Sequence, residues 1–135
     1  MKVNLSQATF IIPIRIESSD RLRNVITTTA FLLENFDTNI MIKEVDHQSI
    51  FEKQAIPILE EIVEDDIWKN FDFNFEKTDE PLFHKTKILN EMITKADTDI
   101  VISYDCDAIL PKESYKIAYD YIVNDGFDVV YPYGH

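Results

Sequence analysis

Two Asp-x-Asp triplets stand close together in the chain, Asp97-Thr98-Asp99 and Asp105-Cys106-Asp107, with the apolar run 100–104 between them. Carboxylates two residues apart at the end of a rigid strand can share one oxygen-preferring cation such as Mg²⁺ or Mn²⁺. A cation held in this way binds phosphate oxygens and acts as a Lewis acid on a leaving diphosphate. Acidic triplets also form solvated turns, so the flanking elements decide between the two interpretations.

Segments with strand-like and helix-like spacing alternate along the chain. Strands are expected at the β-prone runs 8–16, 39–45, 71–76, 99–104 and 127–133. Helices are expected from about 18 to 35, within 49–71 with a break or kink at Pro57, over 81–96 with Pro81 in the first turn, and over 111–125, ended by Gly126. This order predicts an α/β fold: an open, mainly parallel sheet with helices on both faces.

Strand polarity separates the two acidic triplets. In open α/β sheets, ligands bind outside the carboxyl ends of the strands. Asp97 and Asp99 lie at the amino end of the strand expected at 99–104, in the turn that leaves a helix, and they are interpreted as turn formers at the opposite edge. Asp105 and Asp107 follow that strand, so they are the predicted metal ligands.

Length and charge narrow the classes of protein. With 135 residues the chain is predicted to form one domain, 1–135. Its net charge of −12 argues against nucleic acid and anionic membrane surfaces as partners, because both bind basic side chains. A phosphorylated ligand would therefore need a bound cation to reverse the local field.

The sequence also bears on localisation. No apolar run reaches the roughly 20 residues of a membrane span, and no signal peptide or second cysteine is found. These features predict a cytoplasmic protein, free or peripheral at the inner face of the membrane.

Three segments carry a resemblance to a known family: "TFIIPIRIESSDRLRNVI" (9–26), "IMIKEVD" (40–46) and "FHKTKILNEMITKADTDIVISYDCDAILP" (83–111). They resemble the nucleotide-sugar half of GT-A fold glycosyltransferases of the family 2 type, in particular galactosyltransferase-like and bacterial capsule-synthesis members. The resemblance covers nearly the whole chain. It implies a Rossmann-like GT-A fold, a UDP-sugar donor, a glycan acceptor, and Mn²⁺ or Mg²⁺ as cofactor.

The resemblance also implies roles for residues at the first strand and the third helix. Pro13-Ile14-Arg15 matches the family motif at the end of the first strand, where the arginine lies near the nucleotide diphosphate. Glu17 stands where galactosyltransferases usually have a second arginine. Phe83 would lie against the uracil, and Lys85 would replace an arginine near the phosphates.

The remaining implied site residues are acidic. Asp105 and Asp107 match the family's Asp-x-Asp motif, with the first aspartate near the ribose and both assigned to the metal. An acidic residue at the end of the second strand commonly recognises the base. Glu44 and Asp46 both fit that position, and the spacing does not decide between them.

Three hypotheses follow for the function. Family members extend past the last segment matched here, so the resemblance implies that the acceptor-binding part and the catalytic base are absent from 1–135. The chain is therefore expected to be the donor-binding half of a metal-dependent glycosyltransferase, or alternatively a non-catalytic nucleotide-binding fragment. A response-regulator receiver would need an acidic pair after the first strand, an aspartate after the third and a lysine after the fifth. Here the first strand ends in "PIRIE", the third in "FEKTDE", and no lysine follows the fifth, so this alternative is the least favoured.

Overall fold

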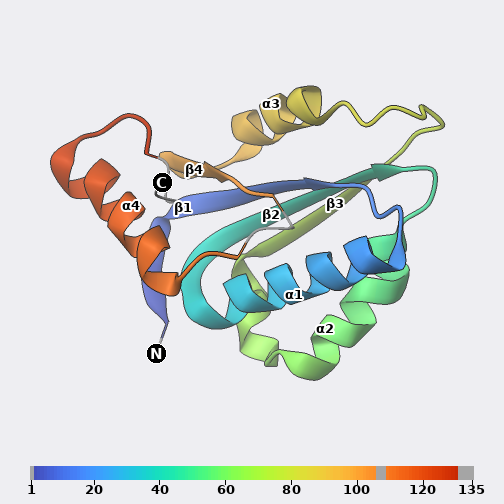
Figure 1. Cartoon of the computed structure of the whole chain (residues 1–135), viewed down its shortest axis with the longest axis horizontal. Coiled ribbons are helices and arrows are strands. Elements are labelled where there is room, and N and C mark those ends of the chain that lie inside the picture. Colours follow the sequence, from blue (N-terminus) through green and yellow to red (C-terminus); the bar gives the residue numbers. More distant parts are fainter. Residues whose placement is uncertain (1, 106–108, 131–135) are drawn as a thin grey trace.

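The computed structural model describes residues 2–105 and 109–130, and within them a parallel sheet and its helices (Figure 1). The strands are β1 (Val3–Ile14), β2 (Phe36–Asp46), β3 (Phe71–Lys77) and β4 (Ile100–Ser103). The helices are α1 (Ser19–Asn35), α2 (Ile56–Ile62), α3 (Lys85–Lys95) and α4 (Lys112–Asp125), with a π-helical turn at Phe51–Ala55 and a 3₁₀ turn at Asp65–Asn70.

The described strands form one all-parallel sheet in the order β3-β2-β1-β4. The chain builds outward from β1 to β2 and β3, and then returns to place β4 on the other side of β1. The direction of winding therefore reverses between β1 and β4, and this reversal is where an open α/β sheet has its ligand crevice. The predicted fold class, an open parallel sheet in an α/β fold, is confirmed.

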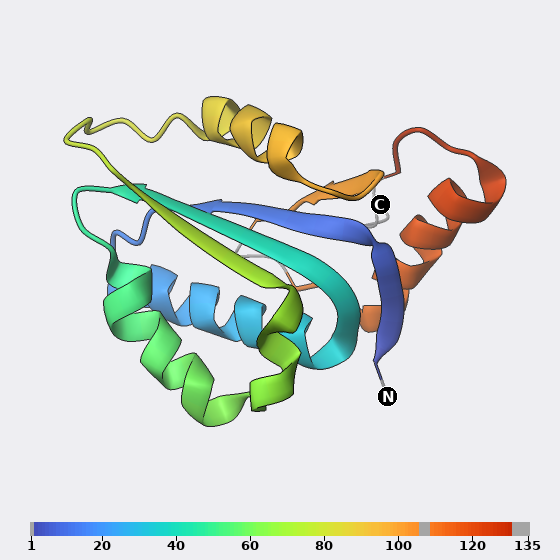
Figure 2. The same cartoon turned by 180° about the vertical axis from the view of Figure 1, so that it is seen from behind.

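Helices cover both faces of the sheet, as predicted. Figures 1 and 2 show α1 and α2 along one face and α3 along the other, with α4 at one end of the sheet. Successive residues of β1 point to opposite faces. Phe10, Ile12 and Ile14 enter the large core with α1, α2 and α4, whereas Ile11 packs with Ile88 and Met92 of α3.

The predicted fifth strand at 127–133 is wrong for the part that the structure describes. Residues 127–130 form no strand, and 131–133 lie outside the described residues. Gly126 ends α4 in the left-handed conformation, with φ of 75°. The chain then turns back, so that the Phe127 amide donates to the Tyr121 carbonyl and the two rings pack edge to face at 5.5 Å. These local contacts hold Phe127 against α4 and away from the sheet.

Two prolines mark the other departures from the expected helices. At Pro57, where a break or kink was expected, the helix changes type without interruption: α2 begins at Ile56 directly after the π-helical turn, and Pro57 lies in the first turn of α2. The prediction that a helix begins at Pro81 is wrong, since α3 begins at Lys85. The Pro81 carbonyl instead accepts a hydrogen bond from Arg15, and residues 78–84 form a connection without helix or strand that bends at 81–82.

Candidate functional site

We call the edge where β1 and β4 part the crevice, because ligands bind at this position in open α/β sheets. Their last paired residues are Ile11 and Ser103, and the Tyr104 amide still donates to the Ile11 carbonyl at 3.1 Å. The Pro13 nitrogen lies on the same side of β1 as that carbonyl, since backbone groups alternate sides along a strand. Proline has no N–H to offer a neighbouring strand, so it fits a place where β4 has already ended. Pro13 is thus buried in the sheet and shapes the crevice.

Arg15 follows β1 and joins three segments at this edge. Its Nε donates to the Val45 carbonyl at 2.8 Å, and one terminal nitrogen donates to the Pro81 carbonyl at 3.0 Å. The guanidinium also lies over the Phe83 ring, 5.5 Å from its centre. Two of the five N–H donors of the guanidinium are therefore used to hold the backbone, and its charge remains at the crevice.

Lys85 and Asp105 meet across the crevice. The Lys85 ammonium lies 3.9 Å from a carboxylate oxygen of Asp105, and both side chains are about half exposed. Lys85 is the first residue of α3, whose first turn carries no acidic side chain and whose N-cap, His84, makes no capping hydrogen bond. The positive end of the α3 dipole therefore adds to the charge of Lys85, which makes this corner favourable for an anion.

The structure brings together four of the predicted site residues: Arg15, Phe83, Lys85 and Asp105. Asp107 lies outside the described residues, so its predicted place beside Asp105 stays a prediction. Asp97 and Asp99 are exposed in the turn before β4, at the opposite edge of the sheet, as the polarity argument expects.

Glu44, a candidate for base recognition, is fully buried near the end of β2. Its carboxylate accepts hydrogen bonds from the Ser49 hydroxyl at 2.5 Å, the Ile50 amide at 2.9 Å and the Phe51 amide at 3.2 Å. Burial raises the pKa of this carboxyl above its usual value, the nearby Asp46 charge adds to the rise, and the three hydrogen bonds oppose it. Glu44 thus holds the chain that leaves β2, and its oxygens face inward.

Asp46, the other candidate, is placed differently. It ends β2 at the carboxyl edge and keeps 14% of its side chain exposed. One carboxylate oxygen accepts from the His47 amide at 2.7 Å and lies 3.0 Å from His47 Nδ1. Of the two acidic residues that the spacing left open, Asp46 is the one with a carboxylate that a ligand at this edge can reach.

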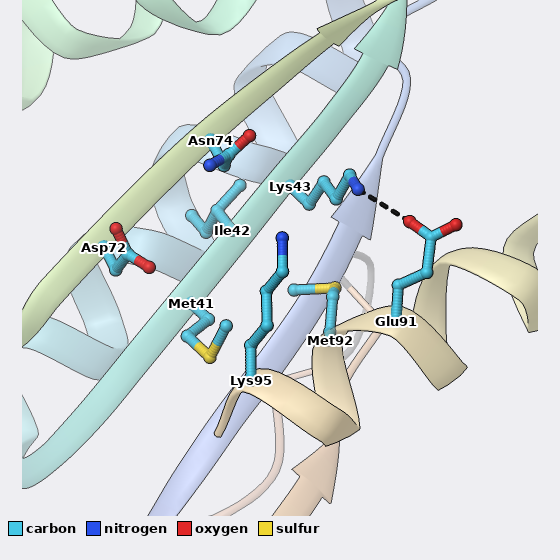
Figure 3. A pocket seen from close by; sticks show the side chains of 8 residues that line it. All are labelled: Met41, Ile42, Lys43, Asp72, Asn74, Glu91, Met92 and Lys95. Atoms are coloured by element: carbon cyan, nitrogen blue, oxygen red, sulfur yellow. Dashed lines mark hydrogen bonds and ion pairs between the residues drawn. The ribbon is translucent and has the colours of Figure 1, made fainter. Parts of the chain in front are cut away.

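Two hollows lie on the α3 face of the sheet. Figure 3 shows the first, beneath α3, where buried Lys43 pairs with Glu91 at 2.8 Å. Lys43 also pairs with Glu76, which the figure does not draw, at 3.1 Å. The accessible space of this hollow, about 20 Å³, suffices for one water molecule. Its lining residues are Met41, Ile42, Lys43, Asp72, Asn74, Glu91, Met92 and Lys95.

The second hollow, of about 280 Å³, lies between α3 and the ends of β2 and β3. Glu76, Glu80 and Glu91 line it together with Lys87. Three carboxylates facing one lysine repel phosphate groups. The corner formed by Arg15 and Lys85 is therefore better suited to an anion than this hollow is.

Two tyrosines next to the site were not singled out from the sequence. Tyr104 directly precedes Asp105, and its hydroxyl lies 2.5 Å from the Tyr115 hydroxyl of α4. The Tyr115 hydroxyl also accepts a hydrogen bond from the Leu110 amide at 3.0 Å. A sequence signal did exist, because Tyr115 and Tyr119 are one helical turn apart and both are buried.

The residues present fit a hard divalent cation shared with a diphosphate. Mg²⁺ and Mn²⁺ commonly bind one or two carboxylates together with phosphate oxygens, and Asp105 offers such a carboxylate at the crevice. Within residues 2–105 and 109–130, no group of three or more His, Cys, Asp or Glu side chains is placed to hold a metal ion. A cation here would thus take its further oxygens from a ligand, from water or from the neighbouring Asp107.

Comparison with known proteins adds no family to this geometry. A scan against models of protein families and a search of curated proteins found no match for the chain. None of the described helices combines the length and the apolar character that crossing a membrane requires.

Proposed function

We propose that this chain binds a UDP-sugar together with Mn²⁺ or Mg²⁺ and supplies the donor site of a glycosyltransferase that transfers the sugar to a glycan. The observation that carries the proposal is the convergence of Arg15, Phe83, Lys85 and Asp105 at the point where β1 and β4 part. These residues come from three separate segments of the chain and combine two cations, an aromatic ring and a carboxylate. A nucleoside diphosphate presents the matching groups.

The diphosphate would lie at the cationic corner. Lys85 stands at the amino end of α3, and the guanidinium of Arg15 is held near it by the Val45 and Pro81 carbonyls. A cation bound at Asp105 would supply further charge neutralisation for the phosphates and for the leaving diphosphate. Lys85 can exchange its contact with Asp105 for a phosphate oxygen when that cation binds, because its side chain is 50% exposed.

The nucleoside would lie along the adjoining edge. The Phe83 ring is partly buried against the cluster formed by Ile11, Val45, Ile88 and Met92, and this packing fixes its plane. A base stacked on such a ring gains about 1–3 kcal/mol. Asp46, at the end of β2, is the acidic residue whose carboxylate can reach the edge of a base there.

Calorimetric titration of UDP into the protein, with Mn²⁺ or with a chelator, tests the proposal. Binding is expected with Mn²⁺ and is expected to weaken at least tenfold with the chelator, in Asp105→Asn and in Asp107→Asn. Asp97→Asn is the matched control, because it makes the same substitution in the other Asp-x-Asp triplet at the opposite edge. It should bind UDP like the unmodified chain.

The outcomes separate the parts of the proposal. Equal binding with and without metal, or in Asp105→Asn, would remove the metal from the site. Absence of UDP binding under all conditions would refute the nucleotide assignment. UDP-sugar binding without any hydrolysis or transfer would favour the alternative of a non-catalytic nucleotide-binding fragment.

A further inference from the structure

We propose that Tyr115 is a positioning residue for the Asp105 carboxylate. Its hydroxyl would connect the two ends of the segment 104–110, which follows β4, and so hold Asp105 at the crevice. The inference rests on the proposed function for the identity of the ligand. The connection that the Tyr115 hydroxyl makes, called the tie below, is formed by protein groups and needs no ligand.

The tie has one contact on each side of the segment. On the β4 side, the Tyr104 hydroxyl lies 2.5 Å from the Tyr115 hydroxyl, and the Tyr104 amide is bonded to Ile11 of β1. On the α4 side, the Leu110 amide donates to the same Tyr115 hydroxyl at 3.0 Å. A single oxygen atom therefore connects the residue directly before Asp105 to the residue directly before Pro111.

The tie is rigid because the aromatic rings around it are fixed. The Tyr104 ring packs edge to face on Phe10 at 5.3 Å, and the Tyr115 ring packs edge to face on Phe36 at 5.0 Å. Tyr115 also packs against Phe31 at 6.1 Å. With the rings held by the core, the hydroxyl groups have little freedom to move, and the backbone bonded to them is held in turn.

Both tyrosines are buried, which decides how the tie responds to the solvent. Burial, and then the hydrogen bond to Tyr115, raises the pKa of the Tyr104 hydroxyl far above its ordinary value. The hydroxyl thus remains protonated throughout the pH range in which proteins are stable. A hydrogen bond between two neutral, buried hydroxyls is insensitive to salt, unlike the half-exposed pair of Lys85 and Asp105.

The Asp105 carboxylate needs such support because its own strand is short. β4 has four residues, and Asp105 lies two residues after its end, half exposed. A carboxylate that must meet a cation within a few tenths of an ångström gains affinity when its backbone is already fixed. Tyr115 supplies that fixation from a helix that does not itself reach the ligand corner.

Tyr115→Phe tests the inference, with Tyr119→Phe as the matched control. Both substitutions remove one buried hydroxyl from α4, and both leave one backbone amide without its acceptor: Leu110 for Tyr115 and Gln7 for Tyr119. Only the first amide belongs to the segment after β4. Hydrogen exchange at Leu110 and calorimetric binding of UDP with Mn²⁺ are the two measurements.

Tyr115→Phe is expected to speed exchange of the Leu110 amide and to weaken binding of UDP with Mn²⁺ by roughly threefold to tenfold, the effect of about one buried hydrogen bond. Tyr119→Phe should change neither. Tyr104→Phe serves as a second variant if Tyr115→Phe fails to fold, and it should weaken binding in the same direction because it removes the contact on the β4 side.

Each outcome decides the inference. Unchanged exchange at Leu110, or unchanged UDP binding in a chain that binds UDP, would overturn it while leaving the proposed function in place. Equal losses in Tyr115→Phe and Tyr119→Phe would also overturn it, since they would indicate a general effect of α4 on stability. If the unmodified chain binds no UDP, the proposed function fails, and the exchange measurement alone decides whether Tyr115 holds the segment.

Discussion

Replacing Glu44 by alanine is expected to destabilise the protein severely, although this residue is one of the two acidic candidates for base recognition at the end of β2. The substitution removes the acceptor of the Ser49 hydroxyl and of the Ile50 and Phe51 amides. These groups open the π-helical turn, and the Glu44 side chain is fully buried. No water can easily replace the lost carboxylate.

The magnitude follows from three hydrogen bonds to one buried acceptor. Each hydrogen bond to a charged group is worth about 1.5–3 kcal/mol, and the cost of burying the carboxylate, seen in its raised pKa, offsets part of the sum. A net loss of about 3–5 kcal/mol is therefore expected for Glu44→Ala. Glu44→Gln should lose only about 1 kcal/mol, because the amide oxygen can still accept from both backbone amides. The total free energy of unfolding of a native protein is about 5–15 kcal/mol, so the loss in Glu44→Ala would be a large part of it.

Urea denaturation measures these changes, with Asp46→Asn as the control beside them. Asp46→Asn should change the free energy of unfolding by less than about 1 kcal/mol but weaken UDP binding, since its side chain is partly exposed at the end of β2 and bonds to the adjacent His47. A loss below about 1 kcal/mol in Glu44→Ala would refute the structural role of Glu44. Normal UDP binding in Asp46→Asn together with lost binding in a folded Glu44→Gln would reverse the assignment of the two residues.

Ionisation gives a second check on Glu44. Its pKa is raised above the ordinary 4.5, so the folded protein holds the proton more tightly than the unfolded chain does. The contribution of this group to stability therefore falls as the pH rises from about 4.5 through the folded value. Glu44→Gln cannot ionise, and its stability should lack this decrease.

Three further predictions concern other parts of the molecule. Lys85→Met should weaken UDP binding about fivefold, and by a smaller factor at high salt. Lys87→Met, two residues further along α3, should leave UDP binding unchanged, and equal effects of the two substitutions in calorimetry would contradict the placement of Lys85. Gly126→Ala should cost about 1 kcal/mol by urea denaturation, because a side chain is strained at φ of 75° although nothing lies within 4 Å of its Cβ; an unchanged midpoint would contradict this. The hydrogen bond and charge of Lys43 lower the pKa of Glu91. The contribution of this pair to stability is therefore complete above pH 4.5 and is lost as the pH falls through the pKa of Glu91 in the folded protein. Glu91→Gln should lose less stability on acidification, and an equal loss of stability would count against the pair.

The fold was largely predictable because its signals are local. The continuous apolar run in β1, the alternation in β3 and the Gly126 cap each follow from spacing and residue type, and they stand where they were expected. The departures come from specific side-chain contacts, one between distant residues and one within a few residues. The bond from Arg15 to Pro81 delays the start of α3, and the packing of Phe127 on Tyr121 removes the described part of the expected fifth strand. Neither contact can be recognised from the spacing of residue types along the chain.

The candidate site was predictable in part for a similar reason. Strand polarity alone placed Asp105 at the ligand edge and Asp97 at the opposite one. It could not show that Glu44 points inward, because that depends on how the chain turns after β2. Nor could it show that Tyr115 reaches back across the segment after β4, since the contact depends on where α4 lies against β1.

The shortness of β4 has a consequence for how ligand affinity should be understood. Within the described chain β4 pairs only with β1 and along only four residues, so it should open more readily than the rest of the sheet. A ligand that needs Asp105 in place can bind only while β4 is closed, and it therefore shifts this local equilibrium toward the closed state. The measured dissociation constant then contains the closing equilibrium of β4, and substitutions that affect only the pairing of β4 with β1 would change affinity without contacting the ligand.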